Sequence, residues 1–256
     1  PGEARYRAAA RQLGRSGRAI GRAYRAERSM PNVGVKLLAS LNLNDDCERC
    51  FYIKLHCKPL PWQMFSGFTS SMDSFTKRSV SFALQAGDGP AWLQEHYGAL
   101  TSVPNPRRNQ MRRDINRLTL TGDPDAIFRK ADGSLLIVDY KCARMNDNQL
   151  AILPKYEAQL NGYAYLLSAL ELGPVTSLAL LYTEAITDFA HPHAIAQRVT
   201  PTGLSLAFEA RLVPVELRPD GLGDVRNVGQ VGQSPDPKAE RVDVAEARLG
   251  AMAQLL

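Results

Sequence analysis

The stretch from Leu118 to Lys141 constrains the fold more than any other part of the sequence. It reads L-T-L-T-G-D-P-D-A-I-F-R-K-A-D-G-S-L-L-I-V-D-Y-K. Apolar segments lie on either side of a Gly122-Asp123-Pro124 kink, and Ala131-Asp132-Gly133-Ser134 supplies residues that tolerate the backbone angles of a hairpin turn. The apolar run from Leu135 to Val138 is typical of a buried strand. The stretch therefore predicts a β-hairpin whose second strand is buried.

Two carboxylates and an ammonium group are expected at the end of this hairpin. Because side chains alternate along a strand, Asp139 and Lys141 should point to one face, with Tyr140 and Cys142 on the other. Asp125 lies one strand back, close enough to share the first face. Burying these charges without partners would be costly. A divalent cation between the two carboxylates removes that cost, and hard oxygen ligands suit Mg²⁺ or Mn²⁺. The alternative is a surface hairpin that ends in a solvated Asp and Lys.

Four segments of the chain resemble one family, in the expected order. Gly122–Ile127 and Ile137–Lys141 are similar to the core of the PD-(D/E)xK nucleases, in their RecB-like exonuclease branch. Tyr156–Tyr163 is similar to the Q-x-x-x-Y helix that follows the hairpin in that branch. Cys47–Tyr52 is similar to the C-P-x-x-F-Y segment at the start of such domains. Together the resemblance covers roughly residues 33–190.

The resemblance implies both a fold and a catalytic site. The fold is α/β, with a restriction-endonuclease-like core in which a central mixed β-sheet is flanked by helices. Asp125, Asp139 and Lys141 are the implied catalytic residues. The two carboxylates and the Tyr140 backbone carbonyl are the implied ligands of Mg²⁺ or Mn²⁺.

One further metal ligand is implied by the resemblance. In the RecB-like branch an acidic residue or His, on the helix before the hairpin, often completes the metal shell. Phe68, Met72 and Phe75 follow helical spacing, and Asp73 lies on this helix. Asp73 is therefore the candidate. The alternative is a solvated Asp beside Lys77 and Arg78.

Two groups of residues are candidates for contact with the nucleic acid. Gln159 and Tyr163 are spaced i and i+4, so they share a helix face, and the resemblance gives them a role in contacting the strand and supporting the site. The other group precedes the hairpin, where arginine would bind phosphate bidentately; its alternative is a merely solvated loop. Its members are Arg107, Arg108, Arg112 and Arg113.

Cys47, Cys50 and Cys57 form a second candidate metal site. The C-x-x-C spacing is typical of metal ligands, but a structural zinc or iron–sulfur site needs four of them. In similar nucleases an N-terminal cysteine joins a cluster near the C-terminus, and the last hundred residues here contain no cysteine. The ligand set is therefore incomplete unless His56 contributes. The alternative is that Cys50, Phe51 and Tyr52 are core residues, since a free Cys packs as a small apolar residue.

Three regions are expected along the chain. Residues 1–30 hold eight arginines and two glutamates, a net +6, which leaves −1 for the other residues of a chain whose total is +5. Such a segment cannot bury enough apolar surface to fold alone, so we expect a flexible arm that contacts phosphates. Its alternatives are an accessory tail, or translated sequence before a start at Met30. Residues 31–217 form the nuclease domain, and residues 218–256 a linker and a short amphipathic helix.

The general composition favours a protein that works in the cytoplasm. With 45% hydrophobic residues, the chain can bury one sizeable core. No apolar run approaches the ~20 residues of a membrane span, and the N-terminus lacks an apolar signal-peptide core. Residues 142–153 read as a mobile polar connection.

These features together predict a Mg²⁺-dependent deoxyribonuclease. We expect an exonuclease or DNA-processing nuclease of repair, recombination or mobile-element metabolism. Its partners would be single- or double-stranded DNA, with a helicase or recombination protein as a candidate second partner. One alternative is a non-catalytic nucleic-acid-binding protein whose arginine arm makes the contacts. Another is a structural metalloprotein organised by the three N-terminal cysteines.

Overall fold

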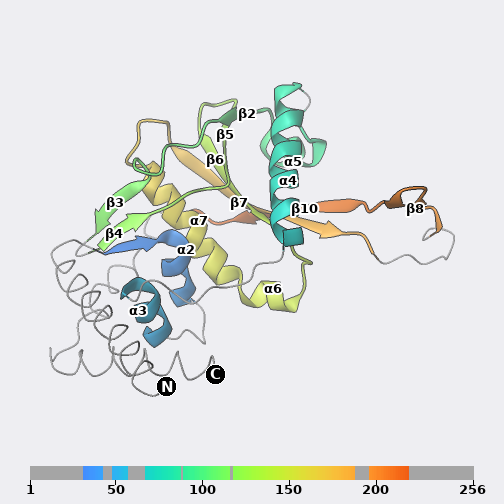
Figure 1. Ribbon diagram of the computed structural model, residues 1–256. Helices are drawn as coiled ribbons and strands as arrows, with labels where there is room; N and C mark the ends of the chain where they lie inside the picture. The colour runs from blue at the N-terminus through green and yellow to red at the C-terminus, as the bar shows by residue number, and fades with distance from the viewer. Residues whose placement is uncertain are drawn as a thin grey trace, which may run out of the picture.

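A computed structural model describes residues 31–42, 48–56, 67–87, 89–115, 118–187 and 196–218 (Figure 1). The predicted arm, most of the predicted C-terminal region, Cys47 and Cys57 lie outside these ranges. The strands are β1 (Asn32–Gly34), β2 (Leu100–Val103), β3 (Arg112–Ile115), β4 (Leu118–Thr121), β5 (Ala126–Lys130), β6 (Leu135–Lys141), β7 (Val175–Ala185), β8 (Val199–Thr200), β9 (Gly203–Leu204) and β10 (Phe208–Val215). The helices are α2 (Val35–Leu38), α3 (Glu48–His56), α4 (Gly67–Gln85), α5 (Ala91–Tyr97), α6 (Asp147–Ala151) and α7 (Leu153–Leu167), and a 3-10 turn spans Ala39–Asn42.

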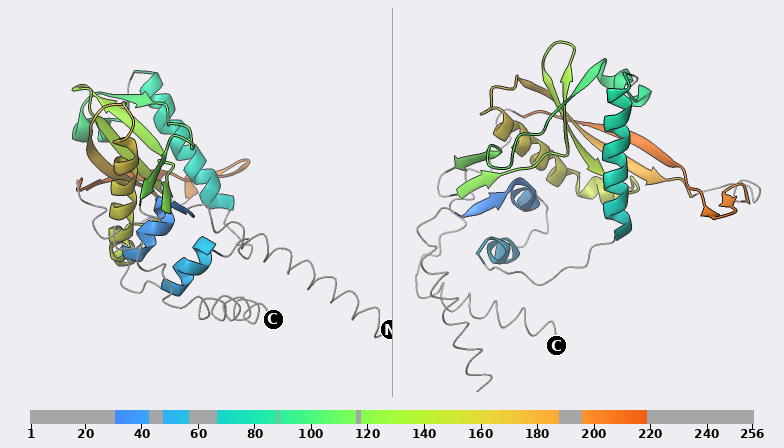
Figure 2. Two further views of the ribbon diagram at one scale, coloured as in Figure 1. Left: turned by 90° about the vertical axis from the view of Figure 1, so that its left-hand side faces the viewer. Right: turned by 45° about the horizontal axis from the view of Figure 1, so that its top comes forward.

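The central sheet is mixed, as predicted. Its strand order is β10-β7-β6-β5-β2. Strands β6 and β7 are parallel and are joined by a crossover through α6 and α7, whereas the other neighbours are antiparallel. Helices cover both faces of this sheet, with α7 on one side and α4 on the other (Figure 2). The α/β fold predicted from the sequence is therefore confirmed.

The predicted hairpin is formed by β5 and β6. Gly133 adopts a positive φ of 83° in its turn, a conformation that glycine reaches without steric cost. Asp132 Oδ1 accepts hydrogen bonds from the backbone and the hydroxyl of Ser134, at 2.9 and 2.6 Å. These contacts fix the turn and, with it, the register that aligns Ala126 with Val138.

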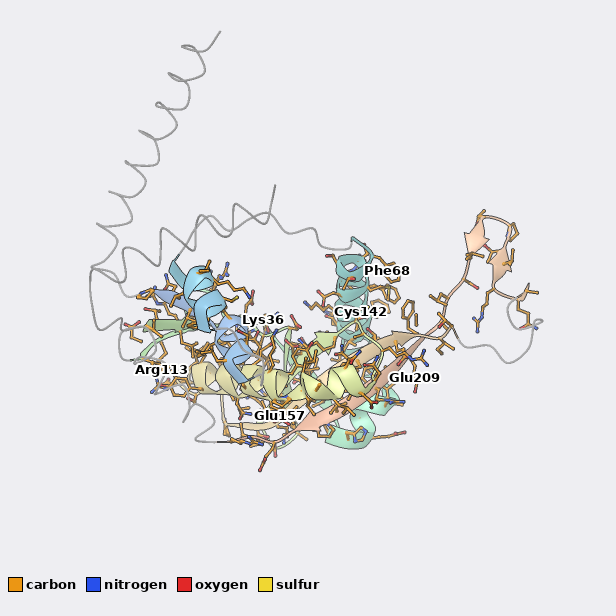
Figure 3. All side chains as sticks on the ribbon, turned by 90° about the horizontal axis from the view of Figure 1, so that it is seen from below. Lys36, Phe68, Arg113, Cys142, Glu157 and Glu209 are labelled. Carbon is orange, nitrogen blue, oxygen red and sulfur yellow. The ribbon has the colours of Figure 1, made fainter. Side chains whose placement is uncertain are left out.

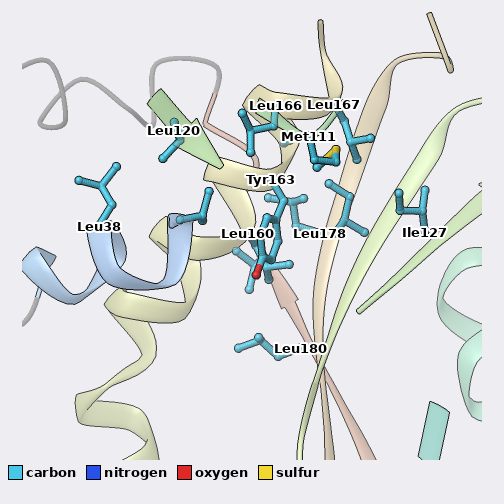
Figure 4. Packing of buried hydrophobic residues seen from close by; sticks show 14 of the residues in the cluster. Leu38, Met111, Leu120, Ile127, Leu160, Tyr163, Leu166, Leu167, Leu178 and Leu180 are labelled. Carbon is cyan, nitrogen blue, oxygen red and sulfur yellow. The ribbon is translucent and has the colours of Figure 1, made fainter. Parts of the chain in front are cut away.

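Strand β6 lies at the centre of the molecule and is buried on both faces. Leu135 and Ile137 belong to the core under α7, while Leu136 and Val138 belong to the core under α4. The α7 core also contains Leu160, Leu166 and Leu167 (Figure 4). Burial of both faces explains why the strand is continuously apolar rather than alternating. It also means that the polar end of β6 emerges from a rigid element.

The Gly122-Asp123-Pro124 kink separates two sheets. Before it, β4 pairs with β1 and β3 in a second sheet of order β1-β4-β3. After it, β5 joins the central sheet. A Cβ atom on Gly122 would lie 2.7 Å from Leu166 Cδ1 and 2.9 Å from Tyr163 Cδ1, closer than normal van der Waals contact. Glycine therefore lets the kink pass directly against α7.

The connection after β6 contains a helix that the sequence did not predict. Residues 142–153, read as a polar connection, contain the short helix α6. The Asn146 side chain caps it by accepting a hydrogen bond from Gln149 N at 3.1 Å. Such an N-cap stabilises a helix of little more than one turn, which is too short to show a periodic apolar pattern. Within the described ranges, no helix has the length and apolar character needed to cross a membrane.

Candidate active site

The candidate site lies at one end of the central sheet, where β5 begins and β6 ends. The pairing of Ala126 with Val138 brings Asp125, the residue before β5, level with Asp139. Asp125 Oδ2 also accepts a hydrogen bond from Tyr140 N at 3.0 Å. The hairpin register therefore places Asp125 and Asp139 at the same level along the sheet.

Asp139 is the most buried charged group of the site. Its side chain is fully enclosed. Oδ1 accepts a hydrogen bond of 2.6 Å from Gln159 Nε2, and Oδ2 forms an ion pair with Lys141 Nζ. Burial raises the pKa of Asp139, and the charge of Asp125 adds to this, while Lys141 opposes it. The ion pair with Lys141 therefore offsets only part of the free-energy cost of burying the Asp139 carboxylate.

Lys141 is held by a second contact besides Asp139. Its Nζ lies 4.1 Å from the centroid of the Tyr156 ring, on α7, in a cation–π arrangement. The Lys141 side chain is 16% exposed. The ammonium group is thus fixed on one side by a carboxylate and on another by an aromatic face, and it still reaches solvent.

Asp125 faces the opposite layer of helices. Lys77 Nζ, on α4, donates a hydrogen bond of 2.9 Å to Asp125 Oδ1. Burial acts to raise the pKa of Asp125, but the hydrogen bond from Lys77 and the charges of Lys36 and Lys77 hold the pKa below its usual value. The sequence had placed Asp125, one strand back, close enough to share the face of Asp139. Asp125 instead sits in the bend before β5, where strand alternation does not apply, and turns toward α4.

Lys77 also joins the predicted ligand Asp73 to the site. Its Nζ lies 2.8 Å from Asp73 Oδ2, one turn earlier on α4. Burial acts to lower the pKa of Lys77, but the hydrogen bonds to Asp73 and Asp125 outweigh it and raise the pKa. From the sequence, Lys77 was expected only as a neighbour of a solvated Asp. The i, i+4 spacing from Asp73 was the available signal, since it puts both groups on the flank of α4 that meets the hairpin.

Gln159 and Tyr163 lie beneath the site rather than on its surface. They are 2% and 1% exposed. Gln159 Nε2 donates both to Asp139 and, over 3.1 Å, to the Tyr163 hydroxyl. Their shared helix face is as predicted, but their burial favours support of Asp139 over direct contact with a nucleic-acid strand.

The four predicted arginines lie on two consecutive segments of the chain. Arg107 and Arg108 lie exposed in the loop after β2, and Asn105 Nδ2 ties this loop to the kink by donating 2.6 Å to Pro124 O. Arg112 and Arg113 belong to β3 of the other sheet. The Arg113 guanidinium stacks 4.3 Å from the Tyr165 ring centroid, and Figure 3 shows it well separated from Cys142, the residue after Lys141. Both segments are anchored at the kink before Asp125, because Arg112 pairs with Thr121 and Met111 O accepts a hydrogen bond from Gly122 N at 3.1 Å.

The possible structural metal site at the cysteines stays a prediction. Cys50 is exposed on α3, while Cys47 and Cys57 are outside the described ranges. Among described residues, no three His, Cys, Asp or Glu side chains gather as a metal cluster. At the hairpin the carboxylates contact ammonium groups instead: Lys77 contacts Asp73 and Asp125, and Lys141 contacts Asp139.

The P-D and D-x-K elements are now in place: Pro124-Asp125 opens β5, and Asp139-Tyr140-Lys141 closes β6. A family model described as the PD-(D/E)XK nuclease superfamily matches residues 70–244. The chain belongs to the PD-(D/E)XK nuclease superfamily. Membership supports hydrolytic nuclease activity on nucleic acid, and nucleases of this superfamily generally use divalent metals such as Mg²⁺ or Mn²⁺.

Other comparisons add little to this PD-(D/E)XK assignment. No curated protein matches the chain. Among solved structures, the crystal structure of SSO0001 is similar over 81% of this chain and 79% of that chain, at 13% identity and a TM-score of 0.36. With a TM-score that low, we rest no conclusion on the likeness.

Proposed function

We propose that the protein is a metal-dependent deoxyribonuclease of the RecB-like branch, acting as an exonuclease or a DNA-processing nuclease. The observation that carries this proposal is the convergence of Asp125, Asp139 and Lys141 at one end of the central sheet. Family membership supports a nuclease in general. The choice of DNA, the dependence on Mg²⁺ and the mode of attack are parts of the proposal.

The donor groups fit a hard divalent cation. Carboxylate and carbonyl oxygens are the ligands that Mg²⁺ and Mn²⁺ prefer. The Lys77 ammonium lies between Asp73 and Asp125, in the place that a metal cation would take. These two carboxylates therefore already bind a positive charge. Asp139 Oδ2 accepts no hydrogen bond from the described part of the chain beyond its ion pair with Lys141. Asp125, Asp139, the Tyr140 carbonyl and Asp73 would hold the metal.

A cation held by these residues would supply Lewis-acid chemistry, which favours attack of water on a phosphate. Lys141 would orient the attacking water and stabilise the negative charge that develops on the phosphate oxygens. Gln159 keeps Asp139 in the orientation that its role needs, in the manner of supporting hydrogen bonds around metal ligands. Lys77, released from the carboxylates, is placed to bind a substrate phosphate. Arg107 and Arg108 add charge along the approach.

A purely binding function is the second candidate, and one observation favours it. Both acidic groups already have ammonium partners, so their charges are balanced without a metal. Magnesium-dependent cleavage of end-labelled DNA by the wild-type protein separates the two. Products that form with Mg²⁺ and disappear with EDTA support the nuclease. Retained DNA binding without products on any substrate supports the binding protein.

A further inference from the structure

A groove leads away from the candidate site along the outer side of α4. It has a volume of about 500 Å³ and is open to solvent. One wall is the C-terminal half of α4, from Lys77 to Gln85, and the other is the end of β2 and the residues after it, 102–105. Residues 125–128 and Tyr140 form its floor, so the groove begins at a proposed metal ligand. A substrate bound in the groove would reach the site directly.

Phe82 stands at the edge of this groove and is 74% exposed. Helix α4 carries two more exposed phenylalanines, Phe68 at 61% and Phe75 at 53%. The three are seven residues apart, so they occupy one side of the helix, while Met72, Thr76 and Val80 pack inward. Only Phe82 of the three lines the groove. Phe68 therefore provides an exposed phenylalanine on the same helix that serves as an internal comparison.

The other groups along the groove are suited to a phosphate backbone. Lys77 and Arg78 line the groove and are positively charged. Arg107 and Arg108 do not line it, but they are exposed in the same loop as the lining residue Asn105. Hydroxyl and amide side chains, among them Ser81 and Gln85, lie between these charges. A positively charged groove with an exposed aromatic ring is the combination that binds single-stranded nucleic acid, since any base can stack on such a ring.

We propose that this groove binds an unpaired segment of the nucleic acid, with one base stacked on Phe82 and the backbone running toward Asp125. Bases inside a duplex keep their faces covered by neighbouring base pairs and cannot offer one to the ring. The groove therefore selects single-stranded ends or flaps over intact duplex. This inference rests on the proposed nuclease function and names the form of its substrate.

The test measures binding of a labelled oligothymidylate, and of a labelled duplex, by fluorescence anisotropy in EDTA. The full chain is used in every variant, so that any contribution of residues 1–30 is constant. Phe82→Ala should weaken single-strand binding by about tenfold to a hundredfold, from the ~1–3 kcal/mol of one base stack. Duplex binding should not change. Phe82→Trp should retain single-strand affinity, and Phe68→Ala should match the wild type.

Each outcome of this binding experiment supports or overturns the proposed role of Phe82. If Phe82→Ala binds the single strand as the wild type does, or loses no more than Phe68→Ala, the groove assignment is overturned while the nuclease proposal stands. Equal losses for single strand and duplex overturn the selectivity for unpaired ends. A wild-type protein that binds neither nucleic acid overturns this inference and the proposed function together. Because Phe82 is exposed, its replacement should leave the thermal unfolding midpoint unchanged, which confirms that each variant is folded.

Discussion

Lys77 donates a hydrogen bond of 2.9 Å to Asp125 across 48 positions of sequence. The same ammonium group lies 2.8 Å from Asp73. This contact fixes α4 against the end of the sheet that carries the candidate site. It also means that a metal ion and the Lys77 ammonium would compete for the same two carboxylates.

We therefore predict that Lys77→Met binds Mn²⁺ more tightly than the wild type. Without the ammonium, Asp73 and Asp125 repel each other, and a divalent cation relieves that repulsion. Loss of this partly exposed ion pair should also lower metal-free stability by up to about 1 kcal/mol, a shift in Tm of roughly 2–4 °C. Calorimetric titration with Mn²⁺ and thermal unfolding in EDTA measure the two effects.

The matched control for Lys77 is Arg78→Met, which removes a neighbouring positive charge that is exposed on α4 and makes no ion pair with Asp125 in the structure. Its Mn²⁺ affinity should change little. Equal or weaker binding by Lys77→Met would show that the ammonium does not occupy the metal's position.

The lowered pKa of Asp125 predicts a pH-dependent contribution to stability. A carboxyl whose pKa is lower in the folded state stabilises the fold above its unfolded pKa, near 3.8, and loses that contribution as the pH falls through the folded value. Asp125→Asn should therefore be less stable than the wild type at pH 7, and the two should converge in acid. Urea unfolding in EDTA across this range measures the difference. A constant gap between the two proteins would contradict the assigned cause.

For Asp139 we predict the opposite dependence of stability on pH. Its pKa is raised, chiefly by burial, so ionisation costs stability as the pH rises from the unfolded pKa through the folded one. We expect Asp139→Asn to be at least as stable as the wild type at pH 7 in EDTA, while it loses cleavage by about a thousandfold or more. Asn keeps an acceptor for Gln159, which Ala would leave unpaired. Clear destabilisation by Asn, measured by urea unfolding, would show that the Lys141 pair outweighs burial.

Gln159 should act on the metal through Asp139. We predict that Gln159→Leu weakens Mn²⁺ binding by roughly 10–100-fold, the usual effect of removing a hydrogen bond to a ligand. Asn161→Leu is the control on the same helix, because Asn161 bonds to the backbone of Glu157, Glu216 and Arg218 and has no contact with the carboxylates. Titration should show an unchanged metal affinity for this control even where its Tm falls. If both variants lose Mn²⁺ affinity equally, Gln159 contributes only to the stability of the fold.

The local sequence was sufficient to predict the hairpin and the polar end of its second strand. A continuous apolar run reports burial on both faces, and Asp139 and Lys141 follow it directly. The i, i+4 spacing of Gln159 and Tyr163 likewise predicted their shared face, though not that both are buried. Whether a helix face points toward the core or toward solvent depends on which elements pack against it. The spacing of residues in the sequence does not give that information.

Contacts between distant segments were not predictable in this way. Strand β1 pairs with β4 through Val33 and Leu120, and nothing in either short segment identifies its partner. The Lys77–Asp125 hydrogen bond is of the same kind, since it depends on where α4 crosses the sheet. Nor could the sequence show that Asp125 lies in a bend and turns toward α4.

The central claim is tested most directly by cleavage of end-labelled single- and double-stranded DNA with Mg²⁺, Mn²⁺ or EDTA. Wild type and Lys141→Met are compared side by side, because Met keeps the length of the side chain and removes the ammonium. We predict metal-dependent products from the wild type and almost none from the variant, with the single strand cut more readily. Equal cleavage by both proteins, or cleavage that persists in EDTA, would contradict the assignment of this site.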